Sequence, residues 1–99
     1  MDELTRVKTI LSDHMEEFRR EYNVEELGVF GSTARGDNRT DSDVDILVSF
    51  NGKVTLFSFA QLELHLEELL GREVDLVMKQ GLKPMIKESV LKSTQYVEA

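Results

Sequence analysis

The sequence contains no cysteine, only two histidines and no long apolar run. Without cysteine, disulfides, thiolate zinc sites and iron–sulfur clusters are excluded, so any bound metal must be a hard cation with oxygen ligands. The N-terminus has acidic residues where a signal peptide has basic ones, and no segment approaches the roughly 18 apolar residues of a spanning helix. We therefore expect a soluble, cytoplasmic protein without a membrane partner.

Positive charge is also in short supply, because 12 lysines and arginines face 19 acidic residues and leave a net charge of -7. This balance repels a phosphate backbone, so we expect no direct binding to nucleic acid. A chain of 99 residues with 40% apolar content has room for one compact core but not for two, so residues 1–99 should form a single domain. A cleft that needs a second wall would take it from another chain, which points to a partner or an oligomer.

The spacing of apolar residues predicts secondary structure in the order helix, strand, strand, helix, strand, helix. The expected helices cover about 2–21, a segment capped by Thr55 or Ser58 and ended by Gly71, and 84 to about 91; the expected strands cover 25–30, 44–50 and 73–78. The small and polar residues 31–42 are expected to form a turn and loop, and 94–98 a short edge strand. The whole chain is therefore predicted to be one α/β unit.

Two carboxylates on one expected strand indicate a metal site. Asp43 and Asp45 are separated by one residue, so both side chains should project from the same face, roughly 6.5 to 7 Å apart along the backbone. Such a pair of like charges is costly unless a cation lies between them, and Mg²⁺ suits them because it prefers oxygen ligands. Asp75 lies opposite the apolar side chains of the third expected strand. If that strand lies beside the second one, Asp75 is the natural third ligand.

A glycine and a serine at the end of the first expected strand indicate a phosphate site. Gly31 lets a phosphate group approach the backbone, while the following amides and the Ser32 hydroxyl can donate hydrogen bonds to phosphate oxygens. Arg35 adds a fixed positive charge nearby. Each residue alone has an ordinary explanation as turn or surface chemistry, as does an isolated Asp-x-Asp pair. Together they indicate a site for a triphosphate and magnesium.

These motifs resemble those of the DNA polymerase β nucleotidyltransferase superfamily. The resemblance rests on the segments Gly31–Gly36, Ser42–Ile46 and Val74–Val77 and spans most of the chain. It is strongest to the minimal nucleotidyltransferases (MNT) of about 100 residues, which include the antitoxins of HEPN/MNT toxin–antitoxin pairs. No motif position departs from the pattern.

The resemblance implies a polymerase β palm-like fold, a small mixed β-sheet flanked by helices. It places Gly31 and Ser32 on the triphosphate of an ATP substrate and makes Asp43, Asp45 and Asp75 the catalytic ligands of two Mg²⁺ ions. It also implies transfer of AMP, or another nucleoside monophosphate, to an acceptor hydroxyl, a tyrosine of a HEPN-type RNase toxin in the antitoxin branch.

Two other functions remain open at the level of the sequence. The chain could be an antitoxin that inhibits its toxin by binding alone, in which case the aspartates would be dispensable. It could also modify a small molecule, as aminoglycoside nucleotidyltransferases do, although those enzymes carry a further acceptor-binding domain.

Overall fold

The computed structural model describes residues 2–37 and 42–98. Within these ranges the chain forms helices and strands in the predicted order, with two additional short helical segments and one helix divided in two. The elements are α1 (Glu3–Asp13), α2 (Met15–Tyr22), β1 (Val24–Phe30), α3 (Gly31–Arg35), β2 (Val44–Phe50), α4 (Leu56–Leu70), β3 (Val74–Met78), the 3₁₀ helix η1 (Lys79–Gly81), α5 (Pro84–Ser93) and β4 (Gln95–Tyr96). None of the described helices is both long and apolar enough to cross a membrane.

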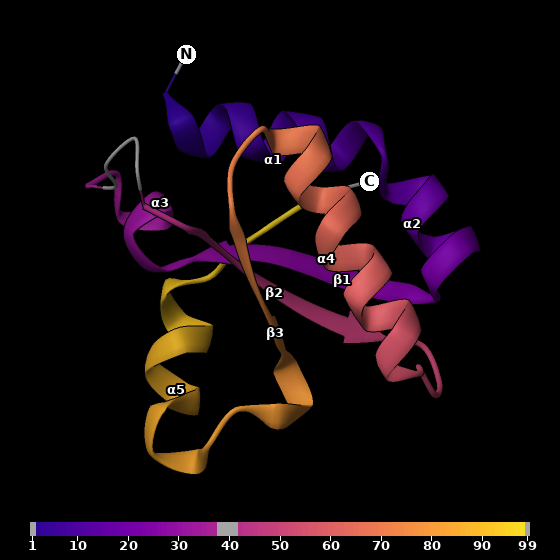
Figure 1. Cartoon of the computed structure of the whole chain (residues 1–99). Coiled ribbons are helices and arrows are strands. Elements are labelled where there is room, and N and C mark those ends of the chain that lie inside the picture. The colour runs from indigo at the N-terminus through magenta and orange to yellow at the C-terminus, as the bar shows by residue number, and fades with distance from the viewer. Residues whose placement is uncertain (1, 38–41, 99) are drawn as a thin grey trace.

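The described strands form one mixed sheet in the order β3-β2-β1-β4 (Figure 1). β1 is antiparallel to β2 and to β4, whereas β2 and β3 are parallel and are joined through α4. The predicted mixed sheet is therefore confirmed. The parallel pair matters for function because it brings the start of β3 beside the start of β2.

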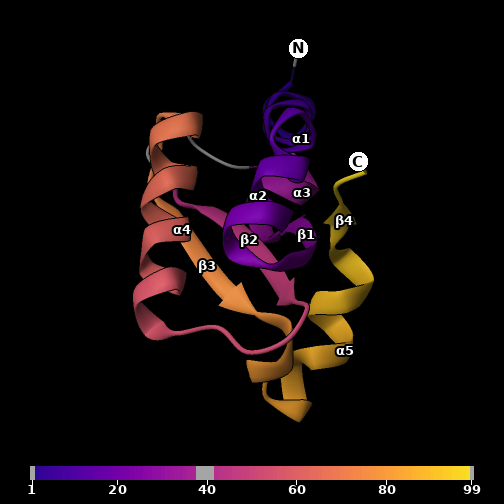
Figure 2. The ribbon, with the colours of Figure 1, turned by 90° about the vertical axis from the view of Figure 1, so that its right-hand side faces the viewer.

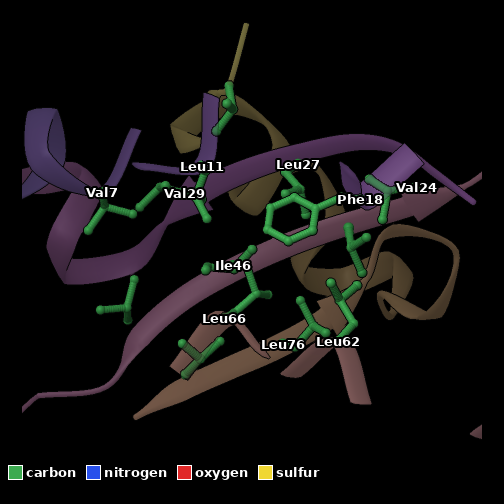
Figure 3. Close-up of a cluster of buried hydrophobic side chains, with 14 of the residues drawn as sticks. Val7, Leu11, Phe18, Val24, Leu27, Val29, Ile46, Leu62, Leu66 and Leu76 are labelled. Carbon is green, nitrogen blue, oxygen red and sulfur yellow. The ribbon is translucent and has the colours of Figure 1, made fainter. Parts of the chain in front are cut away.

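The hydrophobic core lies on one face of the sheet. In Figure 1, α1 and α2 lie above the sheet and α5 below it, and Figure 2 shows α4 and α5 on opposite sides. The core side chains come from α1, α2, α4 and one face of the three longer strands, and Figure 3 shows many of them, including Val7, Leu11, Phe18, Leu27, Ile46, Leu66 and Leu76. α5 contributes no buried residue. On β2, the residues that alternate with the core side chains, Asp45, Leu47 and Ser49, lie on the opposite face of the sheet.

The first predicted helix is wrong in one respect, because it is interrupted at His14. The backbone of His14 has φ −112° and ψ 5°, outside the helical range, and its N–H donates back to the carbonyls of Leu11 and Ser12. The imidazole Nδ1 lies 2.9 Å from the carbonyl oxygen of Ile10. The apolar stripe continues across the break, with Leu11 and Met15 both buried. For that reason the spacing of apolar residues did not reveal it.

The other helix and strand boundaries agree with the prediction to within about two residues. Of the two possible caps of α4, Thr55 is the N-cap, and its side chain accepts the Ser58 N–H at 3.0 Å. Gly71 ends the helix in the left-handed conformation, as expected of a C-cap. The expected edge strand at 94–98 is confirmed as β4, which pairs with Gly28 and Val29 of β1.

Two glutamates of α4 protect the exposed edge of β3. The Glu67 Oε2 accepts the N–H of Val74 at 3.0 Å, and the Glu63 Oε2 accepts that of Leu76 at 3.3 Å. Unpaired backbone N–H groups at the edge of a sheet can pair with a strand of another chain, and here the two carboxylates accept these N–H groups instead.

We expect Glu63→Ala combined with Glu67→Ala to lower the free energy of unfolding by about 2 kcal/mol, measured by urea denaturation. Glu68→Ala, an exposed position on the same helix, is the control, and equal losses in both variants would contradict this role.

Candidate active site

The carboxylates of Asp45 and Asp75 share one end of the sheet. The two residues are register partners on the parallel strands β2 and β3, between the core pairs Val44–Val74 and Ile46–Leu76. Because paired residues of parallel strands project to the same side, both carboxylates lie on the face opposite the core. Asp43 lies one residue before β2 begins and is exposed, so the prediction that it belongs to the strand is wrong by one position.

The predicted Gly-Ser turn is the first turn of a helix. β1 runs directly into α3, whose five residues span Gly31–Arg35 and are followed by Gly36 as a C-cap in the left-handed conformation. The N–H of Asp37 donates to the Ser32 carbonyl at 3.1 Å and closes the turn. Five residues are too few for a helical repeat to show in the sequence, which is why this segment was predicted as loop. Residues 38–41 of the predicted loop lie outside the described residues.

Gly31 is required at its position for two reasons. Its φ is +70°, a conformation that side chains disfavour, and a Cβ added there would overlap the Asp45 carboxylate. The register explains this contact, because Phe30 pairs with Asp45 at the end of the β1–β2 ladder. The bend at Gly31 therefore touches the same carboxylate that faces Asp75.

Burial and the neighbouring charges shift the pKa of Asp45. Burial raises the pKa of Asp45 above its ordinary value, and the nearby carboxylates of Asp75 and then Asp43 raise it further, while Arg35 lowers it. Asp43, Asp75 and the guanidinium of Arg35 therefore all lie close enough to Asp45 to change its pKa. Repulsion of this kind favours a cation at the site.

Arg35 is already paired with a neighbour. It is the last residue of α3, its side chain is mostly exposed, and its Nε donates to the Asp37 carboxylate at 3.3 Å. An exposed pair of this kind is weak, so the guanidinium remains available to a competing anion.

Comparison with known proteins places the chain in a family. The family model described as nucleotidyltransferase domain matches residues 11–97. The chain belongs to the nucleotidyltransferase domain family. It is 49% identical over 94 residues to the protein adenylyltransferase MntA of Thermococcus cleftensis, and the match covers 95% of each chain.

Solved structures of similar proteins have the same fold. A structure named as a minimal nucleotidyltransferase is 39% identical, covers 100% of this chain and 97% of its own, and superposes with a TM-score of 0.73. A structure of a tri-AMPylated Shewanella oneidensis HEPN toxin in complex with an MNT antitoxin is 17% identical, with a TM-score of 0.66 over 93% of this chain and 72% of that one. At that identity the second likeness shows the fold alone. The fold is that of a minimal nucleotidyltransferase.

The acidic residues of this nucleotidyltransferase have the chemistry to bind a magnesium ion if a nucleotide supplies further ligands. Within residues 2–37 and 42–98, no three His, Asp or Glu side chains are close enough to hold a metal ion unaided. Mg²⁺ usually keeps several waters and is bound by one or two carboxylates together with phosphate oxygens of the substrate. The raised pKa of Asp45 and the contact between its carboxylate and Gly31 suit such a shared site, in which nucleotide and protein each supply ligands.

One polar network beside this site was not predicted from the sequence. The Glu3 carboxylate accepts hydrogen bonds from Arg6 at 2.6 and 3.0 Å and from Arg72 at 2.6 Å. Arg72 also donates to the backbone carbonyl of Ser42, next to Asp43. Residues 3 and 72 are too far apart in the chain for any local spacing rule to connect them.

This network should make the stability of the nucleotidyltransferase sensitive to acid. The hydrogen bonds from Arg6, then those from Arg72, lower the pKa of Glu3 from 4.5 to about 2 against the opposing effect of burial. A carboxyl group whose pKa is lower in the folded than in the unfolded protein stabilises the fold at pH values above its unfolded-state pKa. This contribution is lost as the pH falls through its folded-state pKa. We expect the free energy of unfolding to decline between pH 4.5 and 2 more steeply in the wild type than in Glu3→Gln, measured by urea denaturation across this range. Glu21→Gln removes an exposed pair with Arg20 and should follow the wild type. Parallel curves for the wild type and Glu3→Gln would refute the role of Glu3.

Proposed function

We propose that this chain is a magnesium-dependent protein adenylyltransferase that transfers AMP from ATP to a tyrosine hydroxyl of a HEPN-type RNase toxin and so acts as its antitoxin. The observation that carries the proposal is the pairing of Asp45 with Asp75 on parallel strands, with Gly31 against the Asp45 carboxylate. This arrangement gives a triphosphate an approach to the backbone beside two carboxylates that need a cation.

Each residue of the site has a distinct role in this proposal. Asp43, Asp45 and Asp75 hold the magnesium, two ions in our proposal, and the backbone amides after Gly31 together with the Ser32 hydroxyl receive the triphosphate. Arg35 leaves Asp37 and pairs with phosphate. When bound, Mg²⁺ would neutralise phosphate charge and orient the nucleotide.

The transfer itself is an in-line displacement at the α-phosphorus. The acceptor oxygen forms a bond to this phosphorus while the bond to the bridging oxygen of the β-phosphate breaks, and pyrophosphate leaves. Asp75 accepts the proton of the attacking hydroxyl. It is the more exposed member of the pair, whereas Asp45 is half-buried, so Asp75 is the carboxylate that an acceptor from outside reaches first.

A protein acceptor is supported by the relatives and by the fold. The relative that is 49% identical over nearly the whole chain is a protein adenylyltransferase, and a protein of the same fold occurs in complex with an AMPylated HEPN toxin. The carboxylates face away from the core of the fold, so a folded partner can supply the second wall of the cleft.

The proposal is tested by incubating the protein with ATP labelled at the α-phosphate, Mg²⁺ and a HEPN-type RNase toxin that forms a complex with it. We expect label on the partner, located by peptide mass spectrometry to a tyrosine, and none on the partner in which that tyrosine is phenylalanine. Absence of transfer from each of the four nucleoside triphosphates, by a folded protein, would overturn the proposal.

Neutralisation of the toxin in cells separates catalysis from binding alone. We expect Asp43→Asn and Asp45→Asn to lose neutralisation while still forming the complex. Full neutralisation by both variants would instead support an antitoxin that acts by covering its partner.

A further inference from the structure

The backbone on both sides of Asp43 is held by two consecutive residues of the connection between α4 and β3. Before Asp43, the carbonyl of Ser42 accepts a hydrogen bond from Nη2 of Arg72. After Asp43, the N–H of Val44 donates to the carbonyl of Glu73 at 2.9 Å. Arg72 and Glu73 lead directly into β3, which carries Asp75 two residues later. The position of Asp43 is thus tied to the strand that carries Asp75.

The guanidinium of Arg72 is itself fixed. Its side chain is only 13% exposed, and its Nη1 donates to the Glu3 carboxylate at 2.6 Å. Glu3 is held in turn by Arg6, whose Nη2 also donates to the Leu70 carbonyl at 3.1 Å. The planar guanidinium of an arginine can donate hydrogen bonds to a carboxylate and a carbonyl at the same time, in a fixed geometry that a lysine ammonium group does not provide. Arg72 therefore connects the start of α1 to the segment that enters β2.

Asp43 needs such an anchor more than the other two carboxylates do. Asp45 and Asp75 are paired in the β2–β3 ladder, which fixes their separation. Asp43 precedes the first pair of that ladder, Val44 with Val74, and is exposed. Without a fixed Ser42, the distance from the Asp43 carboxylate to the other two would vary.

We infer that Arg72 is a positioning residue, which holds the Ser42 carbonyl and thereby sets the place of the Asp43 carboxylate relative to Asp45 and Asp75. This inference rests on the proposed function, because it assigns the purpose of the anchor to the site for the nucleotide and its cation. Groups that orient metal ligands in this way typically contribute 10- to 100-fold to metal affinity or activity.

Two substitutions separate positioning from general stability. Arg72→Met removes the hydrogen bonds to Glu3 and to Ser42. Arg72→Lys keeps a positive charge for Glu3 and preserves the fold, but it cannot hold both partners in the geometry of the guanidinium. Arg20→Met is the matched control, because Arg20 forms an exposed pair with Glu21 on α2.

Two measurements on these variants test the inference. Amide hydrogen exchange in the free protein should be about tenfold faster at Val44 in Arg72→Lys and Arg72→Met, and unchanged in Arg20→Met. The affinity for Mn²⁺ in the presence of AMP-PNP, followed by electron paramagnetic resonance, should fall at least tenfold in both Arg72 variants. The melting temperature of Arg72→Lys should stay close to that of the wild type.

The outcomes distinguish this inference from the proposed function. Exchange at Val44 and Mn²⁺ affinity within twofold of the wild type in a folded Arg72→Lys would overturn the positioning role. A wild type that binds no Mn²⁺ with AMP-PNP would contradict the proposed function instead. Exchange at Val44 would then decide by itself whether Arg72 anchors this segment.

Discussion

Replacing Asp45 by asparagine is expected to reduce AMP transfer about a thousandfold while making the metal-free protein more stable. The loss follows because a carboxylate that holds the cation supplies several kcal/mol of charge stabilisation in the transition state, and about 4 kcal/mol corresponds to this factor. The gain follows because burial and the charges of Asp75 and Asp43 raise the pKa of Asp45, so its ionised form opposes folding. A neutral side chain of the same shape removes that cost.

Initial rates of AMP transfer and thermal unfolding measure the two effects separately. Asp13→Asn, at an exposed position at the end of α1, should match the wild type in both. Mg²⁺ with AMP-PNP should raise the melting temperature of the wild type and leave that of Asp45→Asn nearly unchanged. An Asp45→Asn protein that transfers AMP at the wild-type rate, or that melts below the metal-free wild type, would be inconsistent with the site described above.

Gly31→Ala is expected to disturb the fold and the site together. The φ of +70° alone should cost about 1 kcal/mol for an alanine. The added Cβ also overlaps the Asp45 carboxylate, which must move. We expect a total loss of about 2 to 3 kcal/mol in the free energy of unfolding and a fall of about a hundredfold in AMP transfer, because a displacement of about 1 Å in a reacting group has an effect of this size.

The chain offers a matched control for the backbone part of this effect. Gly71 has a φ of +68°, nearly the same as Gly31, but a Cβ added there meets nothing within 4 Å. Gly71→Ala should therefore lose about 1 kcal/mol and retain full transfer activity. Denaturation curves and initial rates of the two variants give the comparison. Equal stability losses and equal rates would mean that the Asp45 carboxylate does not depend on the space at Gly31.

The sequence allowed most of the sheet and its covering helices to be predicted, because apolar side chains repeat at regular spacing in the long elements. β2, for example, covers the alternating residues Val44–Phe50 as predicted, although Asp43, which was also assigned to this strand, lies one residue before it. The break at His14 escaped prediction because the core needs the same apolar stripe on both sides of it. α3 escaped because it is short and built from small residues.

The placement of the site residues depends on which strands are neighbours and on tertiary contacts. That Asp75 lies beside Asp45 could only be expected if β2 and β3 are neighbours, which apolar spacing does not specify and which the structure supplies. The contact of Gly31 with Asp45 and the bond from Arg72 to Ser42 are tertiary, between residues 14 and 30 positions apart. The catalytic and binding roles of the six site residues remain predictions.

The most direct test of the central claim, that three carboxylates and the bend at Gly31 form a cation-dependent nucleotide site, is calorimetric titration of the protein with AMP-PNP. We predict binding in the presence of Mg²⁺, at least tenfold weaker binding after the metal is removed by chelation, and the same loss in Asp45→Asn with Mg²⁺ present. Binding of equal affinity with and without Mg²⁺, or no binding by the folded wild type under either condition, would contradict the claim.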